Sequence, residues 1–130
     1  MGFFMALHRD VFPPLIWLLG GGAAIWGGVL AWRRRPVDQA LRALLLGTVV
    51  VGVLQGIVGG ILLLFGLRPP GGSLSFLHYV YGAIVIVAVP IAFTYTDNKS
   101  VRRDLIVFVI AAVIVVAAAV RAFMTGIGLP

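Results

Sequence analysis

Four long apolar stretches, separated by short polar segments, dominate the hydrophobic pattern of this chain. They cover residues 12–32, 43–67, 76–95 and 105–124, and each contains at least 20 residues. At about 1.5 Å of rise per residue, a helix of that length crosses a hydrocarbon layer about 30 Å thick. Backbone polar groups in lipid must be hydrogen-bonded within their own segment, so each stretch is predicted to be a transmembrane helix.

The segments between the apolar stretches are short and polar. They read RRRPVDQALR at 33–42, RPPGGSLS at 68–75 and TDNKSVRRD at 96–104. Connections of this length make consecutive helices antiparallel neighbours. We therefore expect an all-α integral membrane protein, with residues 1–130 forming one up-down bundle of four transmembrane helices. Pro13 and Pro14 are expected to mark the start of the first helix, because the first turn tolerates proline.

The composition supports lipid as the main solvent. Hydrophobic residues make up 62% of the 130 residues, charged residues 11%, and the mean hydropathy is +1.14. So short a chain cannot bury that much apolar surface in a core of its own. The first apolar stretch runs to Trp32 and is followed by three arginines, so we expect a retained helix rather than a signal peptide.

The basic residues act as topology signals. The net charge is +6, but the cations lie in clusters between apolar stretches, and no soluble basic face predicts nucleic-acid binding. Segments 33–42 and 96–104 carry seven of the ten cations, whereas the opposite side has only three: Arg9, Arg68 and Arg121. The positive-inside rule then predicts that segments 33–42 and 96–104 are cytoplasmic and that both termini are outside, in a prokaryotic cytoplasmic membrane.

The only two histidines are predicted to meet at the outer face. His8 precedes the first apolar stretch and His78 opens the third, so an up-down topology returns both to one membrane level. Two imidazoles facing each other across a bundle can ligate a b-type haem. Arg9, Arg68 and Arg121 could pair with its propionates. Two other interpretations stay open: a hydrated interfacial histidine, and a chlorophyll-type pigment held by one of the pair.

Small and polar residues inside the stretches suggest where helices approach. Small residues recur every four positions at Gly20, Ala24 and Gly28, and again at Gly52, Gly56 and Gly60. This spacing favours close helix packing, or room for a flat ligand. Gly82, one turn after His78, leaves space beside that ring. Gln55 lies at mid-membrane, where an amide needs an interhelical hydrogen bond or a ligand.

Other chemistry is not indicated. The chain has no cysteine, which excludes disulfides, thiolate metal sites and cysteine nucleophiles. All four acidic residues lie at or beyond the predicted helix ends. Proton relays usually place carboxylates within the membrane, so a proton pump is not expected.

Several motifs, taken in order, resemble one four-helix half of the haem A synthase family. They are LHR at 7–9, WRRRP at 32–36, VLQGIVGGILLL at 53–64 and FLHYVYG at 76–82. The resemblance covers about residues 5–85. It implies that His8 and His78 ligate haem and that Arg9 supports a propionate. It also implies that Gln55 and three glycines line or pack the pocket: Gly56, Gly59 and Gly60.

The chain also departs from that family. Met5 stands where the family typically has a glutamate, the cysteine pair of many members is absent, and the second four-helix half is missing. The resemblance therefore favours haem binding, for electron transfer or oxidase assembly, over catalysis. Two alternatives remain: a non-catalytic accessory subunit of a respiratory or photosynthetic complex, and a compact haem A synthase-like enzyme. Expected partners are the lipid bilayer and other membrane subunits or a second copy of the chain.

Overall fold

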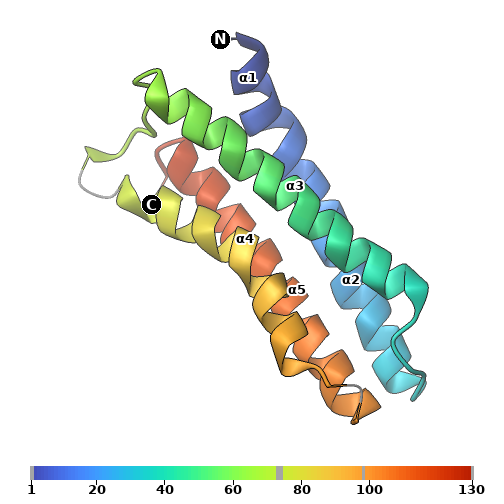
Figure 1. The fold of residues 1–130 in the computed structure, drawn as a ribbon. Coiled ribbons are helices and arrows are strands. Elements are labelled where there is room, and N and C mark those ends of the chain that lie inside the picture. The colour runs from blue at the N-terminus through green and yellow to red at the C-terminus, as the bar shows by residue number, and fades with distance from the viewer. Residues whose placement is uncertain (1, 73–74, 98, 130) are drawn as a thin grey trace.

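The computed structural model describes residues 2–72, 75–97 and 99–129, and they form an antiparallel helical bundle (Figure 1). Four helical runs within these residues are long and apolar enough to cross a membrane, as predicted. Their bounds are Gly2–Trp32, Gln39–Leu64, Phe76–Tyr95 and Val101–Gly126. The third predicted stretch, 76–95, coincides with helix α4 (Phe76–Tyr95), and Pro90 lies inside that helix without ending it.

The first helical run starts ten residues before the predicted position 12. It consists of α1 (Gly2–Ala6), a π-helical turn η1 (Leu7–Val11) and α2 (Phe12–Trp32). The predicted range 12–32 coincides with α2, and Pro13 and Pro14 lie in its first turn as expected, but the helical run continues before α2 through η1 and α1. Prolines lack an N–H group and crowd the carbonyl four residues earlier. The wider π turn, which bonds residues five apart, accommodates them without breaking the run.

The other two helices differ from prediction mainly at their ends. Helix α3 (Gln39–Leu64) begins before position 43 because the Asp38 carboxylate caps it, accepting a hydrogen bond from the Leu41 N–H at 2.8 Å. It ends before position 67, where Gly66 adopts a φ of 79°. Helix α5 (Val101–Gly126) extends beyond the predicted 105–124 at both ends.

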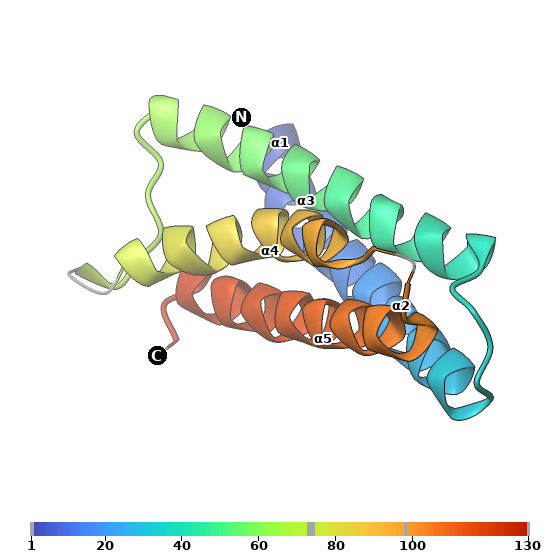
Figure 2. The same ribbon diagram turned by 60° about the horizontal axis from the view of Figure 1, so that its bottom comes forward.

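Each helix packs against its neighbours in the sequence, and α5 also packs against α2. The contact between α3 and α4 is the smallest of these four, and the two helices diverge toward the 65–75 connection in Figures 1 and 2. Helix α5 supplies much of the buried core through five small side chains: Ala111, Ala112, Val115, Ala118 and Ala119. Small residues let helix backbones approach closely, which is the main source of packing between helices in lipid.

The predicted glycine stripes make only part of these contacts. A Cβ on Gly20 would lie 3.0 Å from Val116 of α5, and one on Gly56 would lie 2.7 Å from Ile86 of α4. A Cβ on Gly28 would have nothing within 4 Å, whereas one on the neighbouring Gly27 would lie 2.8 Å from Val109. The α2–α5 contact therefore runs through Gly27 rather than Gly28.

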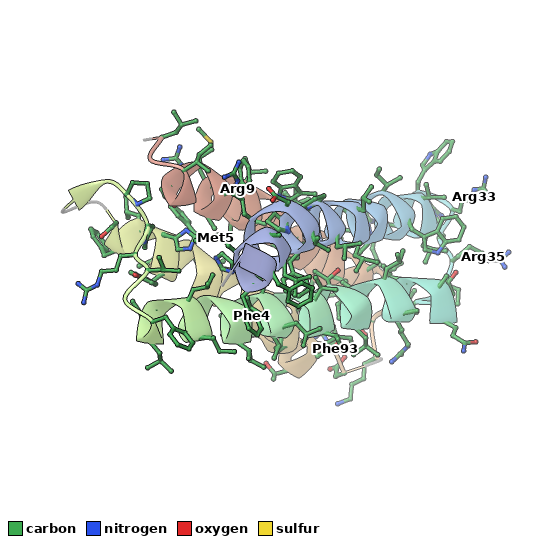
Figure 3. The ribbon with its side chains drawn as sticks, turned by 90° about the horizontal axis from the view of Figure 1, so that it is seen from above. Phe4, Met5, Arg9, Arg33, Arg35 and Phe93 are labelled. Atoms are coloured by element: carbon green, nitrogen blue, oxygen red, sulfur yellow. The ribbon has the colours of Figure 1, made fainter. Side chains whose placement is uncertain are left out.

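The two ends of the bundle differ in chemistry. The N-terminus, the 65–75 connection and the C-terminus lie at one end, which we call the histidine end (Figure 1). The 33–38 and 96–100 connections lie at the other, which we call the arginine end. Figure 3 shows Arg9 toward the first end and Arg33 and Arg35 at the far end of α2.

Candidate functional site

The structure brings the two histidines into contact at the histidine end. The ring centroids of His8 and His78 are 5.9 Å apart, and their planes form an angle of 61°. The residues are 70 positions apart in the sequence, and the antiparallel topology returns them to one level. As predicted, His8 precedes the helix at 12–32, which is α2. It lies within the π turn η1 of the first helical run.

The π turn explains how His8 is held. Its pattern is set by the Phe12 N–H, which donates to the Leu7 carbonyl five residues earlier. The next donor in that pattern would be residue 13, but Pro13 has no N–H. The His8 carbonyl instead accepts a hydrogen bond of 2.9 Å from Nε2 of Gln55 on α3. An unsatisfied carbonyl costs about 1–3 kcal/mol when buried, so this bond ties the π turn to α3.

A backbone carbonyl on α5 sets the proton position on His78. Nδ1 of His78 lies 2.8 Å from the carbonyl oxygen of Ala122. A carbonyl oxygen only accepts, so Nδ1 must carry the proton. The neutral ring then has its lone pair on Nε2, the arrangement common in histidines that ligate metals.

Two glycines on other helices make room for the rings. A Cβ on Gly59 of α3 would lie 2.8 Å from Cε1 of His8. A Cβ on Gly126 of α5 would lie 3.0 Å from Cε1 and 3.1 Å from Nδ1 of His78. Each ring is therefore packed directly against a glycine backbone, and any larger residue there would displace it.

The pair also leaves buried polar atoms unsatisfied. Nδ1 of His8 and Oε1 of Gln55 are buried without a hydrogen-bond partner among the described residues, as is Nε1 of Trp17. The first two belong to residues that already touch through the His8 carbonyl. A proton on Nδ1 would give His8 a donor complementary to the Gln55 oxygen and leave Nε2 as the free nitrogen.

The three predicted propionate partners are not gathered around the pair. Arg9 forms an exposed ion pair with Asp10, with 3.3 Å between Nε and Oδ1. Arg68 is exposed in the 65–75 connection. The Arg121 guanidinium lies 5.8 Å from the ring centroid of Tyr81, in cation–π geometry. All three are at the histidine end, but each has a different environment.

The remaining predicted residues fall into two groups. Gly56 is a packing residue, because α4 fills the space beside it. Gly60 and Gly82 are uncrowded: a Cβ on either would have nothing within 4 Å. They lie on α3 and α4 respectively, the two helices that diverge at this end (Figure 2). Open helix surface is thus available next to the histidine pair.

Sequence reasoning missed the α5 contribution to the site. Ala122 and Gly126 hold His78, but neither carries a polar side chain that would mark it within a uniformly apolar segment. Pro13 lies in the first turn of α2, as predicted, but the sequence did not indicate that the helical run continues before it. In a helix that starts before residue 12, Pro13 would have indicated that the His8 carbonyl lacks a backbone donor, because proline has no N–H.

The donor set limits the chemistry. No group of three or more His, Cys, Asp or Glu residues with metal-binding geometry occurs in the part of the chain that the structure describes. A structural zinc site takes four such ligands and a catalytic one takes three. Two imidazoles alone suit an iron that already has four equatorial nitrogens, as in haem.

Comparison with known proteins adds no further evidence. No family model, curated protein or solved structure matches the chain.

Proposed function

We propose that this protein binds one b-type haem at the histidine end, where His8 and His78 would hold the iron. The observation that carries the proposal is the pair of adjacent rings, in which the Ala122 carbonyl leaves Nε2 of His78 free for ligation. Cofactor sites in helical bundles are commonly built from side chains that project inward from facing helices.

The spacing of the rings supports a shared iron atom. Metal–imidazole bonds are about 2 Å long, and the ring centroids are 5.9 Å apart, close enough for both rings to hold one metal ion.

The surrounding residues have defined roles in this proposal. When bound, the haem would supply one-electron redox chemistry. His8 and His78 would hold the iron, the Ala122 carbonyl orients the His78 ring, and Gln55 fixes the backbone carbonyl of His8. Gly60 and Gly82 leave the α3 and α4 surfaces open beside the pair. Arg9, Arg68 and Arg121 are the cations available to propionates at this end.

We further propose that the histidine end faces outward from a prokaryotic cytoplasmic membrane. The cation distribution supports this orientation, because the arginine end carries seven of the ten lysines and arginines. The proposed role is electron transfer or assembly of an oxidase, in contact with other membrane subunits or a second copy. An accessory subunit binding a chlorophyll-type pigment would need only one of the two histidines.

Haem content after expression with ample haem tests the proposal. The pyridine haemochrome assay should give about one b-type haem per chain for the wild type, and much less for His8→Ala and for His78→Ala. Tyr79→Ala is the matched control, because it removes an exposed ring beside His78 at the same end. Absence of a Soret band in the wild type would refute the proposal. Loss with only one histidine variant would show that a single histidine ligates the haem.

A further inference from the structure

A second candidate site lies at the arginine end, opposite the histidines. A pocket of about 200 Å³ opens between the end of α2 and the start of α3. Val29 and Leu30 form its apolar wall, and Arg33, Arg35 and Asp38 line its polar side. It therefore lies where apolar helix surface meets the basic connection.

The helix end fixes the direction of the two arginines. The Arg33 N–H donates to the Val29 carbonyl and the Arg35 N–H to the Leu30 carbonyl, both at 2.9 Å. Arg34, between them, adopts a φ of 53°, the left-handed conformation typical of the residue that ends a helix. This reversal places Arg33 and Arg35 on the pocket.

The Asp38 carboxylate does not neutralise these arginines. It accepts hydrogen bonds from Nε1 of Trp26 at 3.0 and 3.1 Å and from the Leu41 N–H at 2.8 Å. No ion pair involves Arg33 or Arg35 within the described residues. Arg33 and Arg35 contribute two positive charges to the pocket, and Asp38 contributes one negative charge that is already hydrogen-bonded. The pocket therefore has a net positive charge.

The size and surroundings of the pocket suit a lipid headgroup. Pockets for drug-sized ligands are about 300–1,000 Å³, so this one accepts only a small polar group. Ile25 and Trp32, which neighbour Val29 on the surface of α2, are 72% and 84% exposed. They provide apolar surface for chains that continue from the pocket into the bilayer.

We propose that this pocket binds the phosphodiester headgroup of an anionic phospholipid. Arg33 and Arg35 contact the phosphate, and the acyl chains lie against Ile25, Val29 and Trp32. Basic pockets at the ends of transmembrane helices are known to recognise such headgroups. The proposal does not depend on the haem, because the site is at the other end of the bundle.

Native mass spectrometry of the full chain, with phosphatidylglycerol and phosphatidylcholine of matched chains, tests the site. We expect the wild type to prefer phosphatidylglycerol. The double variant Arg33→Gln/Arg35→Gln should bind it about tenfold more weakly. The matched control Lys99→Gln/Arg102→Gln removes the same charge at the same end, outside the pocket, and should change binding less than about twofold.

Two further measurements separate the pocket from charge alone and from free phosphate. Val29→Phe fills the pocket with all charges kept, and should also weaken phosphatidylglycerol binding. Inorganic phosphate in excess should not displace the lipid, because it makes no contact with the apolar wall. The proposal would be overturned if the two double variants lost phosphatidylglycerol binding equally, or if the wild type bound the two lipids equally. It would also be overturned if Val29→Phe left phosphatidylglycerol binding unchanged, or if inorganic phosphate displaced the lipid.

Discussion

At the residue scale, each histidine is held by a contact that involves no charged side chain. The Gln55 amide bonds the carbonyl of His8, and the Ala122 carbonyl bonds the ring of His78. Glycine backbones at Gly59 and Gly126 pack against the two rings. Such contacts constrain the rings without adding a buried charge, which would be costly in lipid.

Gly59→Ala tests the packing around His8. The added Cβ would lie 2.8 Å from the ring, and overpacking of this kind costs about 1–3 kcal/mol of unfolding free energy. Gly60→Ala is the matched control, because its Cβ meets nothing within 4 Å. The control should be neutral or stabilising by up to about 1 kcal/mol, since alanine favours the helix. Thermal unfolding in one detergent gives the comparison, and equal effects would contradict the described position of His8.

At the element scale, the π turn determines which way His8 faces. A π turn contains one residue more than an α-turn, and one residue rotates an α-helix by about 100°. Without the extra residue, the residues before α2, including His8, would be rotated by about this angle around the axis of α2. The prolines that follow η1 are therefore expected to determine the position of the His8 ring.

Pro13→Ala/Pro14→Ala should consequently lower the haem content severalfold while preserving helicity. The restored N–H groups allow the α-helical register and remove the need for the Gln55 bond to the His8 carbonyl. Pro90→Ala is the control, because Pro90 also lies within a helix but away from the pair. The haemochrome assay and far-UV circular dichroism together check this. Full haem content in the double variant would argue against a role for the π turn.

The sequence predicted the positions of the helices along the chain better than the face that each helix turns toward its neighbours. Length and hydropathy located all four, and helix α4 (Phe76–Tyr95) coincides with its predicted range. The start of α2 at position 12 was predicted, but the helical residues before it were missed, because proline usually marks a helix start and the π turn has no sequence signal. In a lipid-facing segment the apolar residues surround the helix, so nothing indicates which side of α5 faces His78. The topology predicted that the histidines share a level, but their contact required the structure.

At the scale of the whole molecule, the two ends of the bundle carry different functional side chains. The pair of His8 and His78 is at one end, and Arg33 and Arg35 are at the other, at the far end of α2 (Figure 3). The positive-inside rule relates this polarity to an orientation in the membrane. The end with most cations is expected to face the cytoplasm.

Cysteine labelling of intact cells can test this orientation, because the chain has no cysteine of its own. A membrane-impermeant maleimide should label Pro70→Cys, in the connection at the histidine end. It should label Ser100→Cys, at the arginine end, only after the cells are opened. Both positions are exposed, so they serve as mutual controls. The reverse pattern would contradict the proposed orientation.

The central claim is that His8 and His78 ligate the same iron, and the electron paramagnetic resonance spectrum of the oxidised, haem-loaded protein tests it most directly. Two imidazole ligands should give a low-spin signal in the wild type. Removing either ring, in His8→Ala or His78→Ala, should convert the remaining haem to high spin. A high-spin wild type, or a low-spin signal that survives the loss of one histidine, would contradict ligation by the pair.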